Sequence, residues 1–376
     1  MANIYVRSTD GNDADNGTTW ALAKATLVGA LAIATNADTI WVSQNHAETQ
    51  ASAMALTMPT TPGLKILCGN DAAEPPTALA TTATIAVTGN FGISFPSGYA
   101  YTYGITFNSG AGGGGASDIL IGSANSINTH LVFDTCNLSI LSTSTAAPFQ
   151  FGQNGGANSS TDRRADFLNS AFRQDASAIS ALFSIKSGIW YFSNITIAGA
   201  GATPPTSLME CGSTSAPSAV IIENSDLSGR SFTNLVDVTN FTAPVSTFLF
   251  RNSKLPASIN VTTGTFGGSA AGVVDMHNCD SADTHIRFSR NAWQGVTTSQ
   301  TSTRIRTGGA TQADATAYSF LMAGSANSVY ITHPMTSPDM AIFNTSVGSP
   351  MTATDEILRD SVTNHKDNEI WLEVDY

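Results

Sequence analysis

The middle of the chain repeats a six-residue pattern: a large apolar residue, any residue, Asn, a small or apolar residue, any residue, and a second apolar residue. Clear copies occupy residues 167–172, 192–197, 222–227 and 250–255. Degenerate copies begin at Phe133 and Met276, and a copy with Gly104 in place of Asn extends the series backwards. The pivots stand at 104, 135, 169, 194, 224, 252 and 278, separated by 25 to 34 residues. A constant short motif with variable spacing predicts a solenoid in which the strands are constant and the loops vary.

The pivot of each copy has a conformational reason to be Asn. Each copy is too short for a helix and has alternating apolar positions, which predicts a strand or a strand–bend–strand corner. Asn tolerates the left-handed backbone conformation better than other residues with a side chain, and glycine at 104 meets the same need. Stacked Asn side chains of successive coils can also bond to one another. We therefore expect a structural ladder at Asn169, Asn194, Asn224, Asn252 and Asn278.

The same alignment predicts rows of charge. Equivalent residues of stacked parallel coils lie about 4.8 Å apart. The position before the pivot reads Glu223, Arg251 and His277 on successive coils, and two positions after it reads Asp226, Lys254 and Asp280. Both rows alternate in sign or nearly so, which favours a ladder of stacked ion pairs that fixes the register. A carboxylate site in these rows is the functional alternative.

The Asn ladder and the first fifty residues together resemble a known family. A strand at Ile4-Tyr5-Val6 leads into a loop rich in Asp, Asn and Gly that ends in Gly17-Thr18-Thr19-Trp20-Ala21. Next comes an apolar stretch, which we expect to be a helix from about Lys24 to Asn36. A strand at Asp38–Val42 follows it. This order is similar to the capping start of many phage and bacterial β-helix proteins, and the Asn ladder resembles that of the right-handed parallel β-helix of pectate-lyase-like proteins. The resemblance implies an all-β fold, a right-handed parallel β-helix solenoid, whose N-terminal helix plugs the open end.

Three regions are expected along the chain. Residues 1–50 form the N-terminal cap, residues 51–335 the parallel β-helix, and residues 336–376 a C-terminal segment in which the pivot motif stops. Within that segment, Thr354–Thr363 is expected to form a short helix and Glu369–Tyr376 a half-buried strand. Similar phage sequences use such a strand as the lead-in to a further small β domain, and an oligomerisation element is the alternative.

Composition excludes several classes of protein. Charged residues make up 12% of the chain, about half the usual ~25%, and the net charge is −12, so a partner with a phosphate backbone is not expected. Hydrophobic residues make up 42%, which argues against disorder. The longest apolar stretch, Leu27–Ala34, is far shorter than a membrane span, and no signal peptide opens the chain, so we expect a soluble protein made in a cytoplasm. Four cysteines without CxxC spacing, Cys68, Cys136, Cys211 and Cys279, are expected to be buried free thiols.

Residues that could carry chemistry are sparse. The chain has no Asp-Asp dipeptide and no Gly-His-Gly, which a polygalacturonase-like site would need. Glu223 with Asp226, and Asp280 with Asp283, could approach the ~5–9.5 Å separation of glycosidase carboxylates, but the first pair has basic neighbours on the next expected coil. A polar cluster that could bind a metal, without a known ligand spacing, comprises Asp275, His277, Asp280, Asp283, His285 and Arg287. No catalytic residue, metal or cofactor is predicted.

Two functional hypotheses follow. The first is a non-catalytic structural protein of a tailed-phage virion, in particular a capsid decoration or cement protein. Its expected partners are itself, as a homotrimer, and the major capsid protein, without nucleic acid or membrane. The alternative is a tailspike or other β-helix protein that binds or depolymerises glycans. It needs aromatic and carboxylate residues in one groove, and Trp190-Tyr191 has no second aromatic platform evident in its register. A tail or baseplate component of the same fold is a third possibility.

Overall fold

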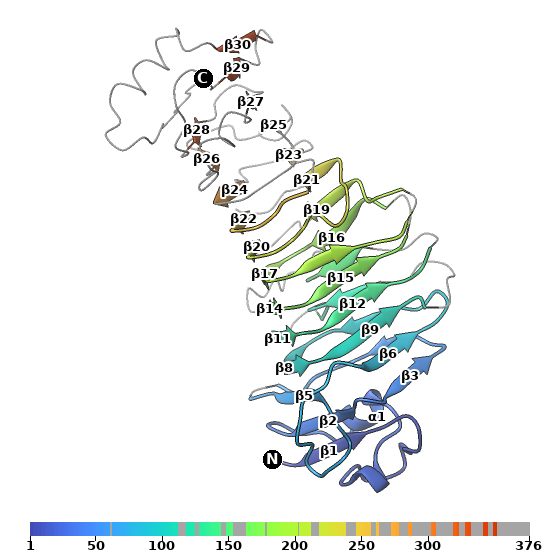
Figure 1. Ribbon diagram of the computed structural model, residues 1–376. Coiled ribbons are helices and arrows are strands. Elements are labelled where there is room, and N and C mark those ends of the chain that lie inside the picture. The colour runs from blue at the N-terminus through green and yellow to red at the C-terminus, as the bar shows by residue number, and fades with distance from the viewer. Residues whose placement is uncertain are drawn as a thin grey trace.

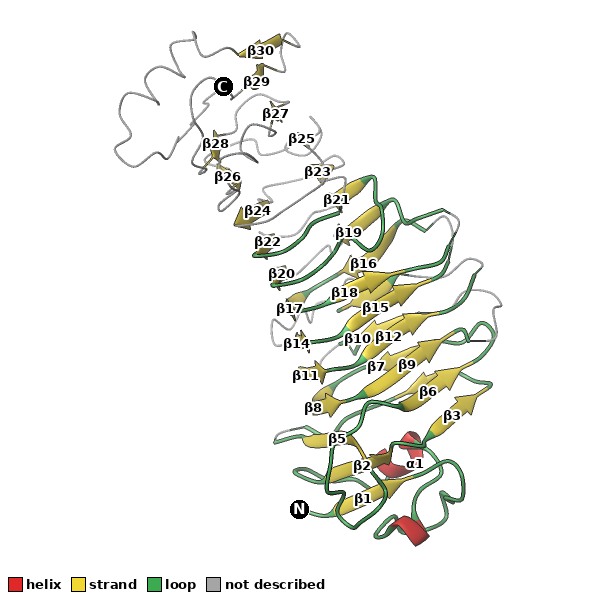
Figure 2. Ribbon diagram, viewed as in Figure 1, coloured by secondary structure: helices red, strands yellow, loops and turns green. Residues whose placement is uncertain are grey.

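Three long parallel sheets dominate the structure, a computed structural model (Figure 1). It describes residues 1–60, 62–111, 118–124, 128–143, 148–152, 163–176, 179–201, 203–211, 218–237 and 246–256, and beyond these only the backbone of the strands from β23 onward. Nearly all of the regular structure in these ranges is β-strand, with one short α-helix and one 3₁₀ turn (Figure 2). The predicted all-β class is confirmed.

From β2 to β19, each turn of the chain adds one strand to each of three sheets. Sheet A contains β1 (Asn3–Val6), β2 (Thr39–Ser43), β5 (Leu64–Gly69), β8 (Gly98–Tyr103), β11 (Thr129–Asp134), β14 (Arg163–Leu168), β17 (Gly188–Ser193), β20 (Ser218–Glu223), β22 (Ser246–Arg251) and β24 (Gly272–His277), in that order. Sheet B contains β3 (Ala47–Gln50), β6 (Ala83–Val87), β9 (Ile105–Ser109), β12 (Asn137–Ile140), β15 (Ala171–Gln174) and β18 (Thr196–Ala198).

Sheet C completes the third side. It contains β4 (Met54–Ala55), β7 (Ile93–Phe95), β10 (Ile119–Ile121), β13 (Phe149–Phe151), β16 (Ala181–Ile185), β19 (Ser207–Cys211), β21 (Asn234–Asp237) and β23 (Val261–Thr262). Every strand pairing within the three sheets is parallel, for example Phe133 with Phe167 and Phe167 with Phe192. This stack of parallel coils is a β-solenoid, as the repeat predicts.

The pivots are the corners between sheet A and sheet B. Six of the seven have a positive φ: Gly104 (74°), Thr135 (54°), Asn169 (51°), Asn194 (54°), Asn224 (51°) and Asn252 (47°). In this conformation the pivot N–H points along the stack, so Asn169 N donates to Ser193 O at 3.0 Å and Asn194 N donates to Glu223 O at 3.1 Å. The left-handed corner that the Asn motif predicts is therefore present on successive coils. The seventh pivot, Asn278, lies outside the described residues.

A row of serines, which sequence analysis did not single out, stabilises the same corner. The residue after the pivot is Ser170, Ser225 or Ser253 on three coils, and all three are buried. Each hydroxyl donates to the carbonyl two residues earlier at 2.7 Å. Each also accepts a backbone N–H from the preceding coil, as when Ile195 N donates to Ser225 Oγ at 3.1 Å. Serine thus satisfies buried backbone groups where the chain turns.

Asn194 provides a test of the corner. Asn194 Nδ2 donates to Asn169 Oδ1 at 2.8 Å, so an alanine loses this bond and also strains the left-handed backbone. We expect Asn194→Ala to lower the free energy of unfolding by about 1–2 kcal/mol in chemical denaturation. Asn194→Gly loses the same side-chain bond but adopts the backbone without strain, so it should be less destabilised. A glycine variant at least as unstable as the alanine variant would contradict this account of the corner.

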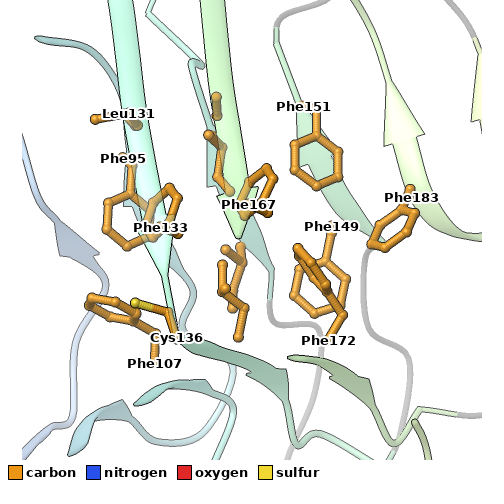
Figure 3. Packing of buried hydrophobic residues seen from close by; sticks show 14 of the residues in the cluster. Phe95, Phe107, Leu131, Phe133, Cys136, Phe149, Phe151, Phe167, Phe172 and Phe183 are labelled. Carbon is orange, nitrogen blue, oxygen red and sulfur yellow. The ribbon is translucent and has the colours of Figure 1, made fainter. Parts of the chain in front are cut away.

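A single core runs through the stack, and phenylalanine fills its middle (Figure 3). Phe133, Phe167 and Phe192 occupy the same inward position of sheet A on three coils, with ring centroids 5.2 Å and 5.0 Å apart and rings nearly parallel. Rings from the other two sheets, such as Phe172 and Phe151, meet this column edge-on. Offset and edge-to-face packing of this kind contributes beyond simple burial of area.

The N-terminal end differs from the prediction. A capping helix from Lys24 to Asn36 is not evident: the 3₁₀ turn η1 covers Trp20–Leu22 and the helix α1 only Leu27–Leu31. Lys24 is unavailable to a helix because its backbone is extended and pairs with β1, with Lys24 N donating to Tyr5 O and Lys24 O accepting from Arg7 N. The edge of β1 has no further strand beside it among the described residues of sheet A, and it is covered mainly by irregular backbone.

Two carboxylates, exposed Asp13 and buried Glu48, hold the start of the short helix in place. Asp13 Oδ1 accepts the backbone N–H groups of Ala25 and Thr26 at 2.9 and 3.0 Å. Glu48, which points inward from β3, accepts Leu27 N at 2.9 Å and is 4% exposed. Leu27 itself lies in the core. Acceptors on the first N–H groups let so short a helix form.

The region after β24 is described only by its strand backbones. These are β25 (His285–Arg287), β26 (Ser302–Ile305), β27 (Ser319–Met322), β28 (Ser328–Ile331), β29 (Ala341–Asn344) and β30 (Ser349–Met351). β25 pairs with β27 and β26 with β28 in parallel, whereas β29 and β30 are antiparallel. The predicted helix at Thr354–Thr363 and strand at Glu369–Tyr376 lie outside the described residues.

Candidate functional site

The outward face of sheet A gathers the most aromatic and charged side chains among the described residues. β8 reads Gly98-Tyr99-Ala100-Tyr101-Thr102-Tyr103, so its tyrosines alternate with buried residues and face away from the core. The adjoining strands β11, β14, β17 and β20 add further outward side chains in register. We call this surface the tyrosine face: Tyr99, Tyr101, Tyr103, His130, Asp134, Arg164, Asp166, Tyr191 and Glu223.

Acidic side chains of the tyrosine face are bonded to neighbouring coils. Tyr101 OH donates to Asp134 Oδ2 at 2.8 Å, from β8 to β11, and Tyr191 OH donates to Glu223, from β17 to β20. Asp134 also accepts Asn169 Nδ2 at 3.0 Å, which joins the face to the Asn ladder. These contacts link consecutive coils, so they oppose slippage of one strand along the next.

Asp166 is the most buried carboxylate of the face. Its carboxylate accepts hydrogen bonds from Arg164 Nε at 2.8 Å and from Arg164 Nη2 at 3.0 Å, which is a bidentate contact within β14. His130 of the preceding coil approaches with Nε2 at 3.6 Å from Asp166 Oδ2, too far for a direct hydrogen bond. The Asp166 side chain is 13% exposed, so the arginine supplies the counter-charge that a largely buried carboxylate needs.

Two tyrosines of the face have raised pKa values. Burial and then the hydrogen bond to Asp134 raise the pKa of Tyr101 above 10, and burial followed by the bond to Glu223 does the same for Tyr191. Both effects favour the neutral phenol, since ionisation would place two negative charges side by side. Because the raised pKa exists only in the folded chain, its contribution to stability is present below pH 10 and is lost as pH rises through the folded value.

Spectrophotometric titration at 295 nm tests these assignments. The folded chain is expected to ionise some of its eight tyrosines late, well above pH 10, whereas the chain in guanidinium chloride ionises them together near 10. Tyr101→Phe should remove part of the late absorbance change and leave the early part unaltered. A Tyr101→Phe curve whose late change keeps its full amplitude would contradict the bond to Asp134.

A groove lies at the N-terminal side of the tyrosine face. Its volume is about 370 Å³, and its lining comprises Met1, Ala37, Asp38, Pro62, Gly63, Leu64, Lys65, Tyr99, Ala100, Tyr101, His130 and Val132. Tyr99 and His130 meet edge to face in it, with ring centroids 6.3 Å apart. Asp38 is buried, and its pKa is lowered because hydrogen bonds from Ala2 and Thr35 outweigh the effect of burial. The groove therefore offers a ligand mainly aromatic and apolar side chains, together with the exposed side chain of Lys65.

The predicted charge rows are formed only in part. Asp226 and Lys254 are bridged across coils and approach to 4.0 Å, although both are about half exposed. Glu223 and Arg251 are Cα partners, but among the described side chains they form no ion pair within 4 Å, because Glu223 accepts Tyr191 OH instead. Asp280 and the predicted cluster from Asp275 to Arg287 lie outside the residues whose side chains are described.

Several other predicted features can be placed. Cys68, Cys136 and Cys211 are buried free thiols as predicted, whereas Cys279 is outside the described residues. Over the described ranges, no group of three or more His, Cys, Asp or Glu side chains is arranged to hold a metal ion. No helix in those ranges has the length and hydropathy to cross a membrane.

Sequence analysis missed the tyrosine face. The residues directly beside Tyr191 in its row are Asp166 and Ile221, so no aromatic side chain stacks next to it. The pairings Tyr191–Asp166, Asp166–Val132 and Val132–Tyr101 nevertheless place Tyr101 in the same outward column, three coils away. The signal that could have found it is the strict alternation of tyrosine with small residues over 98–103.

Comparison of the chain with protein-family models, with curated proteins and with solved structures finds no match. The functional assignment therefore depends on the residues described above.

Proposed function

We propose that this chain is a non-catalytic structural protein of a tailed-phage virion, a right-handed β-helix of the pectate-lyase-like type that decorates or cements the capsid as a homotrimer. Its partner is the major capsid protein. The observation that carries the proposal is the use of outward polar side chains as links between coils. Asp134, Glu223 and Asp226 each bond to or approach a residue of the neighbouring coil.

Such links suit a coat protein better than a carboxylate enzyme. A glycosidase needs one carboxylate that is free to attack or to activate water and one that can donate a proton. Asp166 is held by Arg164 through two hydrogen bonds, and Glu223 accepts a tyrosine hydroxyl. A rod with a low-charge surface, a continuous core and linked coils withstands unfolding and proteolysis, which a particle exposed outside the cell requires.

Labelling of particles tests the proposal. An antibody raised against the full recombinant chain is applied with gold to particles purified from a lysate of the host that carries the gene. Gold regularly spaced over the head is the expected result, with mass spectrometry detecting the chain in the same particles. Gold confined to the tail would move the protein to the tail or baseplate, and particles that lack the chain would contradict a virion role.

A second candidate is a tailspike-like protein that binds or depolymerises glycans, and the groove beside Tyr99 favours it. Aromatic rings that line an open groove can stack against sugar rings. The test incubates the full chain with polysaccharide from the host surface and measures binding and the release of reducing ends. The proposed structural role predicts neither. Binding that is lost in Tyr99→Ala but kept in Asn108→Ala, on the outward face of sheet B, would establish the second candidate.

A further inference from the structure

Among the residues whose side chains are described, two arginines are buried inside the solenoid, and one of them lies near a carboxylate. Arg230 is 7% exposed, and its guanidinium donates to Gln174 O and to Ala176 O, the latter at 3.2 Å. The buried carboxylate of Asp175 lies near enough to favour the charged form of Arg230. Asp175 itself forms an ion pair with Arg173 at 2.8 Å, so its charge acts on Arg230 without a direct ion pair.

Arg163 is the buried arginine on which no carboxylate acts among the described residues. It opens β14 at the corner between sheets C and A and is 2% exposed. Its Nη1 donates to Ser187 Oγ at 2.9 Å on the following coil, and its Nη2 donates to Ala124 O at 2.8 Å on the preceding coil. Both acceptors are neutral, and no ion pair joins Arg163 to any described carboxylate. The guanidinium thus connects three coils, and the described part of the chain supplies no compensating charge.

Two buried N–H groups at this corner also find no acceptor among the described residues. The Nε–H of Arg163 is one, and the Nε1–H of Trp190, whose side chain is completely buried, is the other. Both side chains pack against the same two glycines. A methyl group on Gly188 would lie 2.9 Å from Arg163 Cβ and 3.0 Å from Trp190 Cζ2, and one on Gly122 would lie 3.5 Å from Arg163 Cδ and 3.2 Å from Trp190 Cη2. The two orphan donors therefore belong to neighbouring side chains.

The charge decides what would satisfy these donors. Burial lowers the pKa of the Arg163 guanidinium, but an arginine side chain does not lose its proton in a protein. A buried water could accept the N–H groups, yet it would leave the positive charge uncompensated. A small anion meets both needs, because it accepts the hydrogen bonds and carries the opposite charge.

We propose that a monoatomic halide anion such as chloride binds at this corner, accepting the Nε–H of Arg163 and the Nε1–H of Trp190. The anion neutralises a guanidinium that already bonds to the coils on either side, so it strengthens the stack at its middle. The site is independent of the proposed role in the virion.

Crystals of the full chain grown in bromide test the site directly. An anomalous peak within hydrogen-bond distance of Arg163 Nε is expected, and Arg230, which has Asp175, should show none in the same crystal. Density for a water without anomalous signal, or no density, would overturn the proposal.

Thermal unfolding supplies a second readout in solution. The Tm of the full chain should be about 2–4 °C higher in sodium chloride than in sodium gluconate at equal ionic strength. Trp190→Phe keeps an aromatic ring but removes the N–H together with part of the indole. Its absolute Tm will fall, but its Tm difference between the two salts should also be smaller. Equal differences in the wild type and the variant would show a general salt effect and would contradict the participation of Trp190 in the site.

Discussion

Phe167→Ala is expected to lower the free energy of unfolding by about 3–5 kcal/mol, the range found when large aromatic side chains are removed from protein cores. Phe167 is completely buried and lies between Phe133 and Phe192, with ring centroids at 5.2 Å and 5.0 Å. In a stack of coils, each ring packs against the equivalent rings of the coils before and after it. A cavity at Phe167 therefore removes contacts on both sides and cannot be filled by a local shift.

Equilibrium denaturation in urea measures this effect. The matched control is Phe91→Ala, because Phe91 is 40% exposed and lies outside the core cluster. That variant should change the free energy of unfolding by less than about 1 kcal/mol. Similar losses in the two variants would show that the stacked rings do not determine stability.

The second large effect is expected at Gly98, the first residue of β8. Its φ is +96°, and a methyl group there would lie 2.2 Å from the carbonyl oxygen of Met58. Gly98→Ala must therefore strain the backbone and displace the chain at Met58 on the preceding coil. We expect a loss of about 3 kcal/mol or more.

A variant at Gly89 separates the cost of the left-handed backbone from the cost of the close contact with Met58. Its φ is also positive, at +66°, but the nearest atom to an added methyl group is 4.0 Å away, on the Phe91 ring. Gly89→Ala should lose only the cost of a left-handed alanine, about 1–2 kcal/mol. Equal losses at the two glycines, measured by the same denaturation, would mean that the close approach at Gly98 relaxes without penalty.

The corners could be predicted from sequence because their requirement is local. A left-handed residue between two short strands admits few residue types, so Asn169, Asn194 and Asn224 mark the corners whatever the loops between them do. Thr135 holds the same conformation with a residue that rarely adopts it, and its place in the series was recognisable only from the spacing of its neighbours.

The predicted length of the N-terminal helix was too great because an apolar run does not by itself define a helix. The stretch from Leu27 to Ala34 has the composition of a helix, but Lys24 pairs in an extended conformation with β1. At the other end, Asp38 accepts Thr35 N at 2.9 Å and Ala37 has a φ of 68°, which turns the chain towards β2. A pairing with β1 on one side and a local turn at Asp38 on the other limited the helix to Leu27–Leu31.

By itself, the sequence determined the all-β class, the parallel stacking and the positions of the corners, since periodicity and backbone preference act over a few residues. Only the tertiary structure decided which side chains share a row. Tyr101 and Tyr191 stand ninety residues apart in the chain and reach one column through loops of variable length. The burial of Arg163 was equally invisible, because a charged residue enters a core only where neighbouring coils supply acceptors such as Ser187 and Ala124.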